Sequence, residues 1–402
     1  MKTKLLFAYD CMMVGGTTTA LLSLLQALDH DRYAVDLILY RDTGALLDRI
    51  PPQVRHLPAA AQPSRVPDGV RKLWRSVWNG QVFRAAYYAL KTRRDPAKSS
   101  RMTLWQATER AHASISRRLP EHYDAAIGFI ESWGAHYVTS DRVDADRRIV
   151  WIHPDVDKSY LIPELDRPMY RRADAIVTVS EECRRHLVQK LPRDGHKVVY
   201  IENILDAAAV RRRGAEPVPL PPADAGVRLV SACRIVYASK GLDRGLAALK
   251  RLRDEGLLRN IVWYWIGDGP DLPQARRFVE TNGLERQVRF LGQQLNPLPY
   301  ERMMDVFFLP SRYEGKPMAV TEAQMLGLPC VVTAYAAAAE QVRSGVDGLI
   351  LENTDEAIYE FMKRLCAGEY PVAQWRQAVA EKDFSTAAPL QKVEELWNGC
   401  KE

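Results

Sequence analysis

The sequence has no long apolar run and few cysteines. No stretch approaches the roughly 18 consecutive apolar residues of a membrane-spanning helix, so we expect none. The six cysteines are scattered and form no C-x-x-C pair, which excludes a zinc ribbon and a disulfide framework. They are Cys11, Cys183, Cys233, Cys330, Cys366 and Cys400. Reduced thiols and a cytoplasmic location are therefore predicted.

A secretory signal is also missing from the first residues. Lys2 and Lys4 precede an apolar run, but Asp10 interrupts that run and no small-residue cleavage site follows. We therefore expect the run to be a strand of the fold.

What is present is an ordinary globular composition with one uneven feature, the charge. Hydrophobic residues make up 47% and charged residues 26% of 402 residues, which excludes disorder, collagen and coiled coil for the whole chain. The length suffices for two to three domains. Residues 65–118 contain 13 basic and 3 acidic side chains, whereas the rest contains 43 basic and 47 acidic ones. This segment predicts a polyanionic partner, either a membrane surface or a nucleic acid.

Short apolar runs recur along the chain, each followed by a turn and a helical pattern. They are residues 4–9, 34–40, 125–130, 148–152, 175–179, 197–201, 228–232, 261–266, 287–291, 306–309, 330–333 and 348–351. Several are apolar without interruption, which is typical of strands buried on both faces of a parallel sheet. Their alternation with helical patterns predicts βαβ units and an α/β fold.

A proline-rich stretch separates the two sets of strands. We predict a Rossmann-like domain at residues 1–205, a linker at residues 206–226 and a second Rossmann-like domain at residues 227–375. Residues 376–402 are predicted to return to the first domain as a C-terminal helix. Ligands of parallel α/β sheets bind beyond the carboxyl ends of the strands, so a cleft between the two facing domains is the expected site.

Two loops in those positions could bind a phosphate, and a third could lie close to the ligand. Gly15 and Gly16 open a helix after the first strand, although no P-loop lysine accompanies them, and a plain tight turn explains them equally well. Arg234 and Lys240 flank the loop after the run at 228–232, where an arginine fork and a lysine suit a diphosphate. Solvated surface cations are the alternative. The Asp-Gly turn at residues 267–270 is more often structural.

Two carboxylates seven residues apart make the most specific pattern. Glu314 lies in a loop after the run at 306–309, and Glu322 lies one to two turns into a helix that Pro317 opens. The start of such a helix can bind phosphate, and carboxylates can accept hydrogen bonds from sugar hydroxyls. A capping acid and a solvated helix glutamate are the alternative.

With these residues in this order, the chain resembles the retaining glycosyltransferases of family 4, whose GT-B fold has two facing Rossmann-like domains. Glu314 and Glu322 match the family's E-x7-E pattern, and the resemblance extends over nearly the whole chain. Further matches are Gly15-Gly16, the strand region 173–180, Asn203-Ile204-Leu205-Asp206, Arg234 with Lys240, and the turn at 267–270.

The resemblance implies that the first domain binds the acceptor and the second binds a nucleotide-sugar donor. It implies that Glu322 binds the ribose, that Glu314 contacts the donor sugar, and that Arg234 and Lys240 neutralise the diphosphate. The further donor-binding residues that it implies are Gly15, Gly16, Gly315, Lys316, Pro317, Met318, Val320 and Thr321, with Leu291 and Gly292 near the base. His153 resembles the histidine that reaches the sugar, which makes Glu314, His153, Arg234 and Lys240 the expected catalytic residues.

Three positions depart from the family pattern. Lys240 follows Arg234 by six residues where five is usual, which suggests that one of the two is displaced. Lys316 stands where many members have an aromatic residue, which leaves the sugar open, and Ile204 replaces a usual glycine.

The implied reaction transfers a hexose or related sugar from a nucleotide-diphosphate sugar, with UDP preferred, to a saccharide or polyprenyl-linked acceptor. We expect retained anomeric configuration, no cofactor and no metal. Asp144 and Asp146 mimic a metal-binding D-x-D but are interpreted as solvated loop. A UDP-sugar epimerase of similar fold is the alternative. A nucleic-acid binder is disfavoured, because no helix-turn-helix, zinc or RNA-binding pattern is present.

The basic segment then has an interpretation of its own. Trp74, Val77 and Trp78 follow helical spacing among cations, which is typical of a helix lying on an anionic lipid surface. Packing of that stripe on the core explains it equally well. We predict peripheral contact with the inner face of the cell membrane through residues 65–118.

Overall fold

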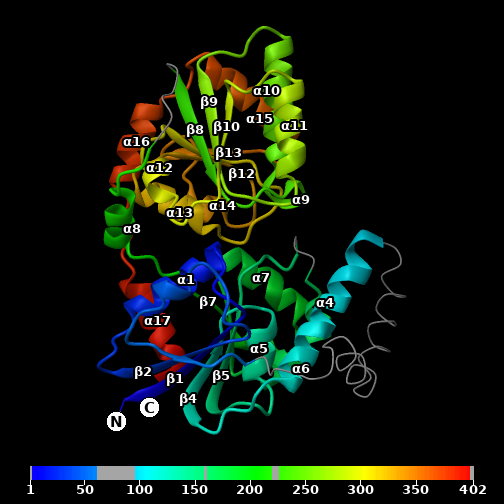
Figure 1. Cartoon of the computed structure of the whole chain (residues 1–402), viewed down its shortest axis with the longest axis vertical. Coiled ribbons are helices and arrows are strands. Elements are labelled where there is room, and N and C mark those ends of the chain that lie inside the picture. Colours follow the sequence, from blue (N-terminus) through cyan, green and yellow to red (C-terminus); the bar gives the residue numbers. More distant parts are fainter. Residues whose placement is uncertain (1, 61–95, 158–160, 220–225, 399–402) are drawn as a thin grey trace. The chain divides into compact units, whose positions relative to one another are not determined.

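The computed structural model describes residues 2–60, 96–157, 161–219 and 226–398, with the side chains of 96–104 left out. These residues form two compact units. The first consists of Met1–Ile204 and Ala387–Glu402, and the second of Leu205–Thr386. Each unit contains one sheet, covered by helices (Figure 1).

Parallel strands form the sheet of the first unit in the order β3-β2-β1-β4-β5-β6-β7. Their bounds are β1 (Thr3–Tyr9), β2 (Tyr33–Leu39), β3 (Arg55–Leu57), β4 (His122–Gly128), β5 (Asp144–Ile152), β6 (Ala175–Thr178) and β7 (Val198–Tyr200). The helices are α1 (Gly16–Ala27), α4 (Pro96–Ile115), α5 (Trp133–Val138), α6 (Arg167–Arg172), α7 (Glu181–Lys190) and α17 (Ala387–Asn398). Short 3₁₀ turns lie at Leu47–Arg49, Pro163–Asp166 and Gly195–Lys197.

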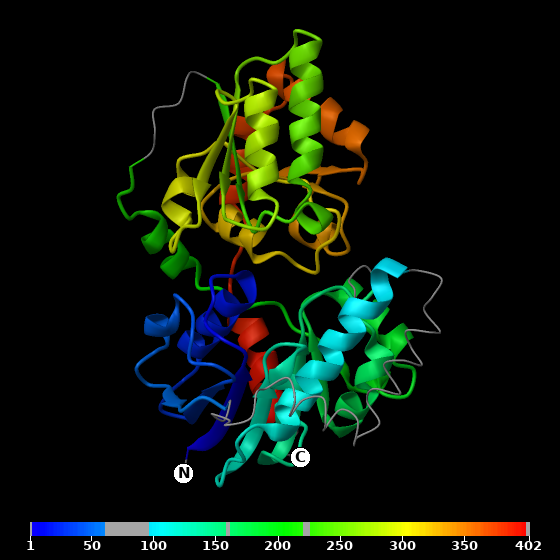
Figure 2. The same ribbon diagram turned by 45° about the vertical axis from the view of Figure 1, so that its right-hand side comes forward.

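Successive side chains of β1 point to opposite faces of the sheet, and each face has its own core. Leu6 and Ala8 of β1 pack with Trp133 of α5 on one face of the sheet. Phe7 points the other way, where its ring contacts Trp397 of α17 at 6.5 Å between centroids. The last helix of the chain therefore completes the first unit beside β1 (Figure 2).

The second unit repeats this arrangement with the order β10-β9-β8-β11-β12-β13, again all parallel. Its strands are β8 (Val227–Ala232), β9 (Ile261–Ile266), β10 (Val288–Gly292), β11 (Val306–Leu309), β12 (Cys330–Thr333) and β13 (Gly348–Leu351). Its helices are α8 (Ala207–Gly214), α9 (Tyr237–Lys240), α10 (Leu242–Asp254), α11 (Leu272–Thr281), α12 (Leu298–Arg302), α13 (Met318–Met325), α14 (Ala338–Gln341), α15 (Asp355–Cys366) and α16 (Val372–Ala380).

Both faces of the second sheet are buried. Leu229 of β8 joins the core under α10, α11 and α15, whereas Val230 joins the core under α12 and α13. Helices α10 and α11 lie side by side on the first of these faces in both views (Figures 1 and 2). Every residue of β9 is buried, which is why this strand is an uninterrupted apolar run in the sequence.

The predicted α/β class with two Rossmann-like domains and parallel sheets is confirmed. Each of the twelve predicted runs lies on an observed strand, and β3 is an additional one.

Part of the stretch predicted as a linker, residues 206–226, forms helix α8 and belongs to the second unit. Asp206 caps that helix by accepting a hydrogen bond from the Ala208 amide at 2.8 Å, a signal that the nearby prolines and arginines obscure. Near the C-terminus, the segment that returns to the first unit begins at Ala387 and not at residue 376 as predicted. The reason is that α16 still packs in the second unit.

Candidate functional site

The strand order of the second unit reverses between β8 and β11, and such a reversal is where doubly wound sheets bind ligands. The segment after β8 carries Arg234 in a loop and Lys240 at the end of the short helix α9, and the loop after β11 carries Glu314. The structure therefore places these three predicted residues at the carboxyl edge of neighbouring strands.

The two loops are held tightly together. Gly241 has a φ of 68°, and a Cβ atom at this position would lie 2.1 Å from the carbonyl oxygen of Pro310. Arg312 adds a second link, since its guanidinium pairs with Asp243 at 2.7 Å and its backbone amide donates to the Ser239 carbonyl at 2.8 Å. The positions of the side chains on both loops are thereby coupled.

Lys240 and Glu314 form an ion pair across these loops. The Lys240 Nζ lies 2.6 Å from the Glu314 Oε1, and 19% and 11% of the two side chains are exposed. Burial opposes the charge on Lys240, but Glu314 outweighs it and raises the pKa of the ammonium above its ordinary value. Ser311 donates to the same Glu314 oxygen at 2.7 Å. The ammonium has three donors, so it can bind a phosphate oxygen while it keeps Glu314 in place.

Arg234 is exposed, and within the described ranges its guanidinium has no hydrogen-bond or ion-pair partner. The Cys233 thiol beside it interacts electrostatically with Lys240, Glu314 and Arg234, and burial raises its pKa to about 12. The two predicted diphosphate cations thus lie near one another, but only Lys240 is held by a carboxylate. The unusual spacing between them is consistent with this difference in placement.

Helix α13 carries the remaining carboxylate. Pro317 occupies the N-cap position instead of the predicted first helical position, and Met318 is the first helical residue. The side-chain amide of Gln341 donates to the Pro317 carbonyl at 3.0 Å and to the Thr321 hydroxyl at 2.9 Å, which fixes the start of the helix. The first amides of a helix lack partners within it, so this end can bind an anion.

Glu322 is half-buried on the second turn of α13. Burial raises the pKa of its carboxyl, and the Arg213 guanidinium of α8 opposes that shift. The remaining predicted binding residues lie on the same stretch. Gly315, Lys316 and Pro317 are in the loop, and Met318, Val320 and Thr321 are on the helix. Lys316 is close to Glu340, with 3.3 Å between the Lys316 Nζ and the Glu340 Oε2.

The end of β10 offers open space where the base was predicted. Leu291 and Gly292 sit at a bulge, and Gly292 has a φ of 70° with no atom within 4 Å of a built Cβ. The turn at 267–270 supports the neighbouring loop, because a Cβ at Gly269 would lie 2.1 Å from the Ile235 carbonyl oxygen. This close contact is what we expect if the turn at 267–270 has a structural role.

In the first unit, Gly15 and Gly16 precede and begin α1 as predicted, and no atom lies within 4 Å of a Cβ built on either. The Tyr9 hydroxyl fixes this turn through Thr17 and Thr18, at 2.8 and 3.1 Å. This open turn also lies at a reversal of strand order, between β1 and β4.

His153 follows β5 at the same edge. Its Nε2 lies 3.0 Å from the Phe129 carbonyl oxygen, which can only accept, so this nitrogen carries the proton and Nδ1 holds a lone pair. Burial lowers the pKa of the ring to about 4. His153 is therefore neutral near pH 7 and can offer Nδ1 as a hydrogen-bond acceptor.

Two carboxyls at this edge of the first sheet were not predicted, and they interact electrostatically with each other. Asp10 follows β1, and the Ser132 hydroxyl donates to it at 2.6 Å. Glu131 lies between β4 and α5, and it accepts from the His153 amide at 3.3 Å. Burial raises the pKa of Asp10 to about 6 and that of Glu131 to about 7. The available signal was a charged residue directly after β1 for Asp10, and one directly after the apolar run at 125–130 for Glu131.

Asp144 and Asp146 do not lie in a loop, which corrects their interpretation. They begin β5 at the amino edge of the sheet, and His122 lies 3.1 and 3.3 Å from them. Among the residues that the structure covers, no group of three or more His, Cys, Asp and Glu side chains could hold a metal ion.

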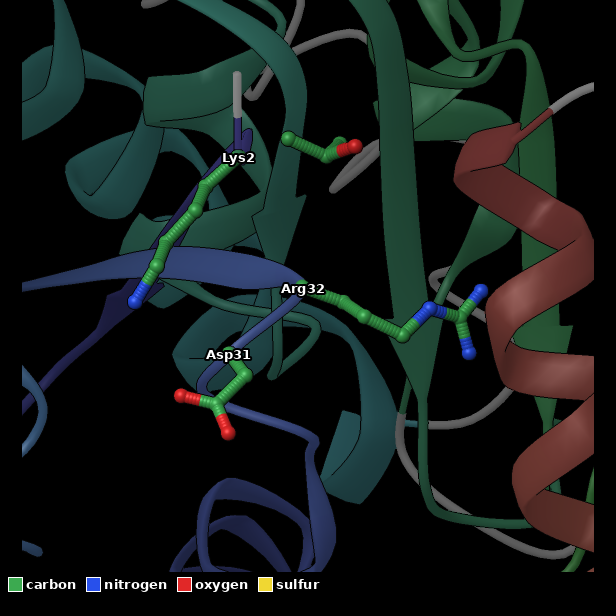
Figure 3. Close-up of a pocket in the computed structure, with 4 residues that line it drawn as sticks. Lys2, Asp31 and Arg32 are labelled. Carbon is green, nitrogen blue, oxygen red and sulfur yellow. The ribbon is translucent and has the colours of Figure 1, made fainter.

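An open pocket lies near the amino end of β1, lined by Lys2, Thr3, Asp31 and Arg32 (Figure 3). Arg32 extends toward α17 and pairs with Glu394 at 3.1 Å. The pocket contains none of the predicted site residues, which lie beyond the opposite ends of the strands.

Most of the second unit is similar in sequence to a known protein family. Residues 226–367 match the family model of the glycosyl transferases group 1. The matched stretch contains all of the predicted site residues of the second unit.

Two curated relatives match shorter stretches of the chain. The Vi polysaccharide biosynthesis protein VipC/TviE of Salmonella typhi is 36% identical over 127 residues, 30% of this chain and 22% of that protein. The UDP-Gal:alpha-D-GlcNAc-diphosphoundecaprenol alpha-1,3-galactosyltransferase of Escherichia coli is 33% identical over 110 residues, 27% of this chain and 28% of that protein. The chain thus spans about a quarter of the length of these relatives.

A solved structure is similar over nearly the entire chain. HepE from Anabaena, determined in complex with UDP and glucose, superposes with a TM-score of 0.65 at 17% identity and covers 98% of this chain and 99% of its own. This similarity confirms the α/β fold of GT-B type.

The predicted membrane contact concerns residues 65–118, and Trp74, Val77 and Trp78 lie outside the described residues. No helix in the described part of the chain is long and apolar enough to cross a membrane.

Proposed function

We propose that this protein is a glycosyltransferase that moves a hexose or related sugar from a UDP-sugar to a saccharide or lipid-linked saccharide. The product would belong to a cell-surface polysaccharide, as the names of the curated relatives suggest. We further propose that the reaction retains the anomeric configuration, requires no metal or other cofactor, and takes place in the cytoplasm at the inner face of the membrane.

The ion pair between Lys240 and Glu314 is the observation that best supports this proposal. It joins the two loops at the switch point of the glycosyltransferase domain, with Arg234 exposed nearby. Departure of UDP builds negative charge on the diphosphate, and fixed cations in a partly buried site stabilise that charge. Glu314 would accept a hydrogen bond from a donor-sugar hydroxyl through its second oxygen.

The residues of the first unit suit an acceptor. Neutral His153 offers a lone pair, Glu131 accepts from the His153 amide, and Asp10, which accepts from Ser132, follows β1 at the same edge of the sheet. Carboxylates bind hydroxyl-rich ligands because each offers several acceptor sites. We propose that the acceptor saccharide binds at this edge of the first sheet.

The experiment is a screen of UDP-sugars with undecaprenyl-diphosphate-linked and free saccharides, with and without EDTA. We expect transfer in both conditions, and proton NMR of the new linkage should show the anomeric configuration of the donor. An inverted product would contradict retention, and a loss of turnover in EDTA would contradict metal independence. Conversion of the donor without acceptor would favour an epimerase instead.

A further inference from the structure

A buried carboxyl in the second unit takes no part in the proposed sugar transfer. Glu301 lies on α12 with 0% of the residue exposed. Within the described part of the chain, neither of its carboxyl oxygens has a hydrogen-bond partner. Buried polar groups are nearly always paired, so an unpaired carboxyl requires an explanation.

The elements packed around Glu301 bring few charged groups to it. Helix α12 packs against α8 and α13, and the groups that interact electrostatically with Glu301 are Arg213, Glu322, Cys233 and Cys330. Burial raises the pKa of both thiols, so they are neutral. Among the described residues, the charged groups that interact with Glu301 are therefore the Arg213 guanidinium and the Glu322 carboxylate. The Nε of Arg213 is itself buried without a partner.

The protonation state of Glu301 follows from these surroundings. Burial and the nearby Glu322 raise the pKa of Glu301 well above its ordinary value, against the opposing effect of Arg213. A neutral carboxylic acid has one O–H donor and a carbonyl acceptor, whereas a guanidinium can only donate. Arg213 can thus satisfy the carbonyl oxygen of Glu301, and the charged acceptor available for its proton is the Glu322 carboxylate.

We propose that Glu301 is a positioning residue of the nucleotide site, which as a neutral acid donates a hydrogen bond to Glu322, directly or through one water. In this arrangement Arg213 would donate a hydrogen bond to the carbonyl oxygen of Glu301. This inference rests on the proposed function, in which Glu322 binds the ribose hydroxyls. The carboxylate of Glu322 is thereby kept ionised and turned toward the ribose.

The test compares two substitutions of nearly equal size. Glu301→Gln keeps a hydrogen-bond donor but cannot ionise, and Glu301→Leu keeps neither. Calorimetric titrations use three probes, namely UDP, 2′,3′-dideoxy-UDP and inorganic pyrophosphate. We expect Glu301→Leu to weaken UDP binding about 10-fold and to leave binding of the other two unchanged, because they lack the ribose hydroxyls. We expect Glu301→Gln to bind UDP within about two-fold of the unmodified protein.

A pH series gives a second readout that a purely structural role would not change. When Glu301 loses its proton at high pH, the donor is lost and a second negative charge appears beside Glu322. The UDP affinity of the unmodified protein should then fall relative to that of Glu301→Gln as pH rises. The comparison cancels the titration of UDP itself, which is common to both proteins.

Two results would overturn the role of Glu301 and leave the proposed nucleotide site intact. One is an equal loss of UDP and pyrophosphate binding in Glu301→Leu, and the other is parallel pH profiles of the unmodified protein and Glu301→Gln. If Glu322→Ala leaves UDP affinity unchanged, or if the unmodified protein does not bind UDP, the proposed nucleotide site fails as well. Glu301→Gln keeps the test valid should Glu301→Leu not fold.

Discussion

Lys240 holds a full positive charge in a site where four-fifths of its side chain is shielded from water. The ion pair with Glu314 stabilises this charge, with 2.6 Å between the Lys240 Nζ and the Glu314 Oε1. A partly buried ammonium acts on a developing negative charge more strongly than a surface lysine, because water screens it less.

Lys240→Met should therefore reduce the rate of sugar transfer strongly, by about 100-fold in kcat/KM. The thermal unfolding temperature should fall as well, since Glu314 loses its ion partner. The matched control is Lys250→Met, which removes an exposed lysine paired with Asp254 on α10. Steady-state kinetics of both variants provide the measurement. Equal kinetics in the two variants would contradict a role for Lys240 in the reaction.

Asp10 and Glu131 predict how stability depends on pH. Their folded pKa values of about 6 and about 7 lie above the ordinary values of carboxyl groups, because both are buried. Between pH 4 and pH 7 the folded protein thus binds more protons at these groups than the unfolded chain does. The free energy of unfolding should fall as pH rises through this range.

The double variant Asp10→Asn/Glu131→Gln should flatten this slope and stabilise the protein at pH 8 by about 2 kcal/mol. Denaturant unfolding at several pH values measures it. A double variant with the same slope as the unmodified protein would show that the two carboxyls titrate normally.

At the residue level, the sequence revealed the groups that stand in a recognisable motif. Glu314 and Glu322 could be named from their spacing, and Arg234 and Lys240 from their order along the chain despite an unusual spacing. Glu301 and Arg213 could not, since they are 88 positions apart and only the packing of α8 against α12 brings them together. No local pattern distinguishes Glu301 from the solvated glutamates of other helices.

At the scale of elements, one glycine determines how closely two loops approach. Gly241→Ala would place a methyl group 2.1 Å from the Pro310 carbonyl oxygen in a left-handed conformation. Gly256→Ala is the matched control, with a φ of 70° but no atom within 4 Å. The left-handed conformation costs about 1 kcal/mol in either variant, and the clash adds about 2 kcal/mol in Gly241→Ala alone.

Denaturant unfolding and UDP titration of both glycine variants test this. Gly241→Ala should lose stability and UDP affinity, whereas Gly256→Ala should lose only a little stability. Equal effects would mean that the loops can separate without consequence for binding.

The elements that were predicted and those that were missed differ in burial. Strands such as β9 are buried throughout, so their apolar runs stand out in the sequence. Strand β3 has three residues, two of them exposed, and in the described part of the chain it pairs with β2 alone, so its sequence carries little signal. Helix α8 was taken for linker because three arginines and a proline-rich stretch follow its apolar start, and only its packing on α12 and α13 reveals it.

At the scale of the whole molecule, the chain ends in the unit in which it began. Trp397 is 4% exposed and packs its ring against Phe7 and Tyr33 at 6.5 and 5.8 Å. The first sheet therefore depends on a helix that lies nearly 400 residues from its first strand, and a contact over that separation leaves no local pattern in the sequence.

Trp397→Ala should destabilise the first unit by about 4 kcal/mol. Hydrogen exchange should report faster exchange in β1 and β2 and unchanged exchange in β8 and β9. The reciprocal control is Trp375→Ala, because Trp375 is 2% exposed in the core of the second unit. Faster exchange in both units of either variant would contradict the separate cores.

The central claim is that the switch point of the second sheet binds a nucleotide diphosphate. A crystal structure of the protein with UDP tests it most directly. The account predicts the diphosphate within hydrogen-bonding distance of Arg234 and Lys240, and both ribose hydroxyls on the carboxylate of Glu322. UDP bound elsewhere, or bound here with its ribose away from Glu322, would contradict it.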